Sequence, residues 1–117
     1  MLPRASGVLA CAFALLVPAL AAAQASAPVG DAEAGRVKTR MCDGCHGISG
    51  YRTAFPEVYR VPLIGGQHPA YIVRALQAYR SGDRSHPSMR AIAASLTDQD
   101  MADLAAYYGN AGKVASK

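Results

Sequence analysis

Cysteine is scarce in this sequence: the 117 residues include three, and only Cys42 and Cys45 lie close together. No second C-x-x-C pair accompanies them, whereas a structural zinc site usually takes a second pair of ligands at a defined spacing. Runs of basic residues of the kind that form nucleic-acid-binding arms are also absent. The longest apolar run lies near the N-terminus and is too short to span a bilayer comfortably. These absences argue against a zinc protein, a nucleic-acid-binding protein and an integral membrane protein.

The N-terminal segment has the features of a cleaved export signal. Arg4 supplies the positive charge, residues 7–20 form the apolar segment, and A-x-A boxes end at Ala23 and Ala25. We expect cleavage after Ala23, with Ala25 as the alternative site and an uncleaved membrane anchor as the alternative interpretation. Cys11 would leave with the signal, so the exported chain would keep no thiol for a separate disulfide. The protein is therefore expected in the periplasm.

Cys42, Cys45 and His46 form a C-x-x-C-H motif, which is the attachment site of a c-type haem. Two thiols three residues apart lie on one face of a helical turn, where each can add to one vinyl group of the same porphyrin. His46 follows directly and can place its imidazole on the iron as the proximal ligand. A thioredoxin-like redox pair would need a βαβ context, and a simple disulfide would leave His46 unexplained. We therefore predict one covalently attached haem c per chain.

The rest of the chain is expected to be helical, because apolar residues recur at helical spacing and no segment alternates as a strand would. A first helix should run from the N-cap Asp31 through the haem motif. Residues 47–66 should form a loop, because their glycines and prolines break any regular period. The other expected helices cover residues 69–81, a short stretch over 89–96, and a last segment that begins at the capping pair Thr97 and Asp100 and stops at Gly109.

These elements make up one domain. We expect residues 1–23 to be the signal peptide, 24–30 a flexible leader, 31–109 the folded domain and 110–117 a flexible tail. A domain this small buries only a modest core unaided, so a haem would supply much of the missing apolar surface.

The order of these features resembles that of the bacterial class I c-type cytochromes. The similarity is closest to the small single-haem cytochromes c-five-fifty-three, and it extends to one half of the dihaem cytochromes c-four. It implies an all-α class I cytochrome c fold, with three to five helices wrapped around one covalent haem. Beyond the haem motif, the residues that carry the resemblance are Pro62-Leu63, Gly66-Gln67, Tyr71, Gly82-Asp83-Arg84, Met89, Leu96-Thr97-Asp98 and Ala106-Tyr107.

The resemblance also implies roles for two further residues at the haem. The carbonyl of Pro62 would receive the other ring N–H of His46, a contact that fixes the orientation of the imidazole. Met89 would be the distal axial ligand, and methionine is a normal ligand in cytochromes c. His86 is the main rival for that position. Met101 fits the core stripe of the last helix, and Met41 adjoins Cys42 on the wrong side of the haem.

Two other features follow from the resemblance. Gly35 and Tyr107 would form a close contact between the first and last helices. The sequence has no tryptophan, so the tryptophan found near a haem propionate in the mitochondrial members is absent. The candidates for that position remain Tyr51, Arg60 and Arg84.

Ligation by histidine and methionine leaves no open position on the iron and raises its reduction potential, which favours one-electron transfer over substrate chemistry. We therefore expect a periplasmic electron carrier rather than an enzyme. Its partners would be redox proteins such as a membrane oxidase, a reductase or a periplasmic dehydrogenase. Two alternatives remain open: a ligand-binding or catalytic, peroxidase-like haem protein with a displaceable sixth ligand, and a haem c subunit of a larger oxidoreductase.

Overall fold

The computed structural model describes residues 26–54 and 58–114, with side chains described as far as Asn110. The expected signal peptide and its cleavage site lie outside these ranges. The described residues form helices and contain no strand beyond an isolated antiparallel bridge between Arg52 and Arg60, as the all-α prediction requires. The helices are α1 (Ala32–Lys38), α2 (Arg40–His46), α3 (Pro69–Ser81), α4 (Pro87–Ala94) and α5 (Asp98–Val114).

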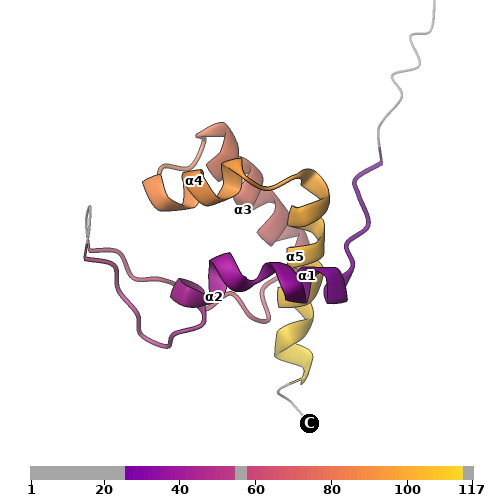
Figure 1. The fold of residues 1–117 in the computed structure, drawn as a ribbon, viewed down its shortest axis with the longest axis horizontal. Helices are drawn as coiled ribbons and strands as arrows, with labels where there is room; N and C mark the ends of the chain where they lie inside the picture. Colours follow the sequence, from indigo (N-terminus) through magenta and orange to yellow (C-terminus); the bar gives the residue numbers. More distant parts are fainter. Residues whose placement is uncertain (1–25, 55–57, 115–117) are drawn as a thin grey trace, which may run out of the picture.

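Helix α5 is the centre of the packing. Figure 1 shows α1 crossing α5, with α2 and the following loop extending away from that crossing. Helix α3 packs against both α5 and α4. The buried side chains come mainly from α5 and include Met101 and Leu104, both almost fully excluded from solvent. The core cluster consists of Ile72, Leu96, Met101, Leu104, Ala105 and Tyr108.

The crossing of α1 and α5 depends on Gly35, as expected. A Cβ atom at this position would overlap the carbonyl group of Asp103 and press against the Cβ atom of Tyr107. Gly30 packs against the carbonyl of Ala102 in the same way, and Val29 accepts a hydrogen bond from the Gln99 side chain at 2.8 Å. The end of the expected leader is therefore held against α5.

Lys38 closes the same crossing with two ion pairs. Its Nζ lies 2.6 Å from carboxylate oxygens of both Asp100 and Asp103. The Asp103 carboxylate is buried, and it also accepts hydrogen bonds from the Asp31 backbone N–H at 2.9 Å and the Gln99 side chain at 2.8 Å. The Asp31 N–H and the Lys38 ammonium lower the pKa of Asp103, and the same ammonium lowers the pKa of Asp100.

These lowered pKa values predict acid destabilisation. The folded state binds fewer protons at the two carboxyls than the unfolded state does, so their contribution is present above the ordinary aspartate pKa of about 4 and is lost as pH falls further. We expect Asp103→Asn to lower the free energy of unfolding at pH 7 by about 1–3 kcal/mol and to flatten its fall below pH 4. Denaturant unfolding of the haem-loaded protein between pH 7 and pH 3 measures both effects. Parallel pH profiles for the two proteins would contradict the assignment.

Four helix boundaries differ from the sequence prediction, and one of them is the end of α4, which lies at Ala94 instead of Leu96. The first expected helix is interrupted at Thr39, whose buried side chain donates to the Arg36 carbonyl at 3.1 Å; such a bond competes with the helical pattern and bends the chain. Helix α4 begins at Pro87 instead of after it, because proline suits the first helical position when a capping residue precedes it. Here the capping residue is His86, whose ring nitrogen accepts the Met89 N–H.

The prediction that the last helix stops at Gly109 was also wrong, because α5 continues through Val114. Gly109 instead permits a close approach: a Cβ atom there would overlap the Pro69 ring at the start of α3. Residues 110–114 of the expected tail therefore belong to α5, and residues 115–117 lie outside the described ranges. Within those ranges, no helix has the length and apolarity that crossing a membrane would demand.

Candidate functional site

The haem motif occupies its own short helix. Cys42 and Cys45 both lie on α2, Cys42 half-buried and Cys45 exposed, and both thiols are free. No residue of α2 is buried. Among the described residues, no three His, Cys, Asp or Glu side chains are grouped as metal ligands, whereas a structural zinc site would take four.

Helix α2 is tied to the core by a hydrogen bond, and Cys42 also packs against the core cluster. The Tyr108 hydroxyl on α5 donates to the Asp43 carboxylate at 2.6 Å. Burial, together with this bond, raises the pKa of Tyr108, so the hydroxyl stays a donor at any ordinary pH. Burial also raises the pKa of the Cys42 thiol. A protonated thiol is a poor nucleophile for disulfide exchange, which argues against Cys42 as the attacking thiol of a thioredoxin-like pair.

The structure brings His46 and Pro62 together. Nδ1 of His46 lies 2.7 Å from the Pro62 carbonyl oxygen, the contact that the family resemblance implies. A carbonyl can only accept, so Nδ1 carries the proton and the lone pair of Nε2 is available to a metal. The loop that presents Pro62 is itself anchored, because the Gly66 N–H donates to the Tyr108 carbonyl at 2.8 Å.

Met41 and Met101, the other two methionines considered as ligands, lie in different surroundings from Met89. Met89 lies in the first turn of α4 and is half-buried. Met101 is fully buried in the core on α5, as its helical spacing predicts. Met41 is exposed on α2 beside Cys42. Of the methionines in the described ranges, Met89 is the one that lies in the α3–α4 unit rather than on the motif helix or in the α5 core.

Several large apolar side chains around the motif are exposed to solvent. Leu63, next to the His46-bound carbonyl, is 58% exposed. Large exposed apolar groups of this kind usually mark a binding surface. A flat apolar cofactor that is joined to α2 and bordered by the loop would cover such groups, so the residues present fit a haem. The others on the loop and at the start of α3 are Ile48, Tyr51, Val58 and Tyr71.

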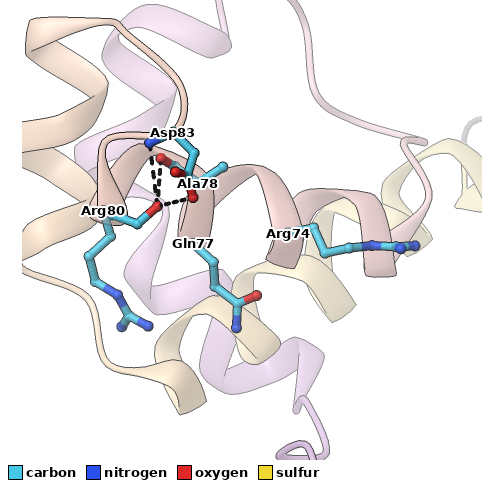
Figure 2. A pocket seen from close by; sticks show the side chains of 6 residues that line it. Arg74, Gln77, Ala78, Arg80 and Asp83 are labelled. Carbon is cyan, nitrogen blue, oxygen red and sulfur yellow. Dashed lines mark hydrogen bonds between the residues drawn. The ribbon is translucent and has the colours of Figure 1, made fainter.

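A shallow hollow beside α3 is separate from the site around the haem motif. Figure 2 shows Arg74 at one end of it and Asp83 at the other. Three of its polar side chains are paired: Ser81 donates to Asp83 at 2.7 Å, and Arg80 forms an ion pair with Asp98 at 2.6 Å. None of the expected site residues lines this hollow.

Sequence reasoning missed two features near the site: the bond between Tyr108 and Asp43, and the role of His86 as a helix cap. The Tyr108–Asp43 bond joins positions 65 residues apart, and no local pattern indicates such a contact. The capping role of His86 had a signal, since a polar residue directly before Pro87 is typical of a helix start.

Comparison with known proteins gives a consistent result. The family model for cytochrome c matches residues 32–110. The chain is 41% identical over 92 residues to cytochrome c4 of Thiocapsa roseopersicina, an alignment that covers 77% of this chain and 45% of that protein. It is 39% identical over 84 residues to cytochrome c-554(548) of Halomonas halodenitrificans, covering 69% of this chain and 96% of that one.

Two further similarities concern architecture and assembly. The cytochrome subunit of sulfide dehydrogenase of Chlorobaculum tepidum is 31% identical over 113 residues, which cover 97% of both chains. The crystal structure of reduced cytochrome c4 from Pseudomonas stutzeri superposes with a TM-score of 0.50 at 29% identity, over 70% of this chain and 51% of that one. The chain thus spans about half the length of the cytochromes c4 that it matches.

Proposed function

The chain belongs to the cytochrome c family, and from this we propose that it is an exported carrier of single electrons whose haem iron is held by His46 and Met89. It is a class I c-type cytochrome with the all-α fold of that class. It carries covalently attached haem c and is an electron-transfer protein rather than an enzyme. When bound, the haem supplies an iron that takes up and releases one electron.

The attachment role falls to Cys42 and Cys45, which are free thiols on one short helix. His46 follows them as the proximal ligand, and this is supported above all by its 2.7 Å bond to the Pro62 carbonyl. That bond leaves Nε2 free for iron, fixes the plane of the ring and increases its basicity. Pro62 therefore acts on the iron through His46 rather than by contact.

Met89 supplies the sixth ligand, and the position of its rival supports this choice. His86 accepts the Met89 N–H through Nδ1 at 3.3 Å. A neutral imidazole with Nδ1 as acceptor carries its proton on Nε2, so neither nitrogen offers iron a lone pair while the cap is formed. A thioether in this place closes the iron to substrates and raises its potential, which suits electron transfer.

The partners are redox proteins, such as a membrane oxidase, a reductase or a periplasmic dehydrogenase. Export of the chain to the periplasm follows from the N-terminal signal features. The test is to express the full chain with a haem-attachment system, fractionate the cells and measure the intact mass of the haem protein. Cleavage after Ala23 or Ala25 and recovery in the periplasm are expected. Recovery of the uncleaved chain in the membrane fraction would contradict cleavage of the signal and would support the membrane-anchor alternative.

A haem subunit of a larger oxidoreductase is the second candidate. The observation that favours it is the full-length similarity to the cytochrome subunit of sulfide dehydrogenase. Native size measurement in an extract of the source cells separates the two proposals. A free carrier elutes as a small haem protein, whereas a subunit elutes in a complex that contains a second polypeptide.

A further inference from the structure

His86 joins three segments of the fold at the start of α4. Its Nδ1 accepts the backbone N–H of Met89 at 3.3 Å and so caps the helix. Its ring stacks in a tilted arrangement on Tyr59, with 4.6 Å between ring centroids. It also meets Tyr79 of α3 edge-on, with 6.4 Å between centroids. The imidazole therefore contacts the loop after the haem motif, α3 and α4 at once.

The identity of this cap is informative. Helix caps are usually serine, threonine, aspartate or asparagine, whose short side chains reach the first turn. An imidazole nitrogen can accept the same hydrogen bond, and the flat ring adds surface for stacking on other aromatic rings. Its neighbour Tyr79 is held in turn, because the Arg84 guanidinium lies over the Tyr79 ring at 4.6 Å and donates to the Tyr71 hydroxyl at 3.3 Å. The cap at His86 is thus supported by side chains on two sides.

The capped residue is Met89 itself. An N-cap bond to the third helical residue fixes the backbone from which that residue's side chain extends. Withdrawal of the Met89 thioether from an iron atom would have to strain or break this bond, or leave the backbone in place and swing only the side chain. The bond at His86 therefore acts against loss of the sixth ligand by movement of the Met89 backbone.

We propose that His86 is a positioning residue for the sixth ligand: its cap bond holds the Met89 backbone so that the thioether resists displacement from the iron. The inference rests on the proposed assignment of Met89 as that ligand. His86, the alternative candidate for the sixth ligand, then acts on the iron only indirectly, by holding the Met89 backbone.

The same loop serves the proximal side. Tyr59, which supports the His86 ring, is fixed by two hydrogen bonds to Thr53, at 3.0 and 3.1 Å. Three residues later in that loop, the Pro62 carbonyl holds His46. One hydrogen-bonded loop therefore supports both positions from which the iron would be ligated.

The test compares three variants of the full haem-loaded chain. His86→Ala removes the cap bond, and His86→Asn restores it with a side chain that caps well. Thr97→Val is the matched control, because Thr97 caps α5, a helix without a proposed iron ligand, through its bond from the Asp100 N–H at 3.1 Å. The measurement is optical titration of each ferric protein with imidazole, with the long-wavelength absorption band of thioether-bound ferric haem as the second readout.

We expect His86→Ala to bind imidazole about five- to tenfold more tightly than the parent, the factor that corresponds to a lost cap of ordinary strength. His86→Asn should remain within about twofold of the parent, and so should Thr97→Val. The thioether band should weaken in His86→Ala and be retained in the other two.

Three results would overturn the inference in distinguishable ways. Equal imidazole affinity in His86→Ala and the parent, with Met89→Ala binding far more tightly, would remove His86 and leave the Met89 assignment intact. The same gain in His86→Asn or in Thr97→Val would show that the cap bond is not the cause. An unchanged spectrum and affinity in Met89→Ala would remove the ligand assignment itself, and the role of His86 with it.

Discussion

We expect the double variant Cys42→Ala, Cys45→Ala to carry no covalent haem and to show no cooperative unfolding transition. Helix α2 buries no residue of its own, and the core cluster is drawn mainly from α3 and α5. A domain of this size has little apolar burial to spare, so loss of the cofactor removes the surface against which α2 and the loop at 47–66 would pack. Intact mass under denaturing conditions and far-ultraviolet circular dichroism measure the two effects.

Cys11→Ala is the matched control, because it removes a thiol that is expected to leave with the signal peptide. This variant should carry one haem and fold as the parent does. Retention of native helical content by the double variant without haem would contradict the proposed part of the cofactor in the core.

Met89→Ala should lower the reduction potential by an amount on the order of 0.1 V, a modest part of the roughly 0.8 V over which axial ligands tune haem iron. A thioether favours the ferrous state, and its removal opens the sixth position to water or added ligands. The measurements are a spectroelectrochemical titration and the binding of cyanide to the ferric protein.

Met101→Leu provides the control for Met89→Ala. Met101 is fully buried in the core, and a swap of this kind usually costs less than about 1.5 kcal/mol of stability. It should leave the spectrum and the potential as they are. If Met89→Ala kept the parent spectrum and His86→Ala changed it, His86 would be the ligand.

Much of the helical framework was predictable because its signals are local. Pro69 opens α3 and Gly82, with φ of 94°, ends it, as their backbone preferences require. The capping pair at the start of α5 is present as expected, with the Thr97 N–H donating to Asp100 at 2.9 Å. Such features depend on a few neighbouring residues, and the sequence displays them directly.

The errors arise where side-chain contacts, some local and some between distant segments, changed the meaning of a sequence signal. Gly109 indicated a helix end, but it serves the contact with Pro69. Thr39 fitted a continuous helix, but its buried side chain bends the chain. The site follows the same rule: the motif was readable, whereas the bond from Tyr108 to Asp43 became visible only when distant segments were placed together.

The most direct test of electron transfer through a closed haem is an optical redox titration of the purified full chain at neutral pH, repeated with added cyanide and peroxide. We predict a single one-electron wave, low-spin spectra in both oxidation states, slow reaction with cyanide and no peroxide turnover. A high-spin ferric spectrum that binds cyanide at once, with rapid peroxide turnover, would contradict the electron-carrier function and identify an open, reactive haem.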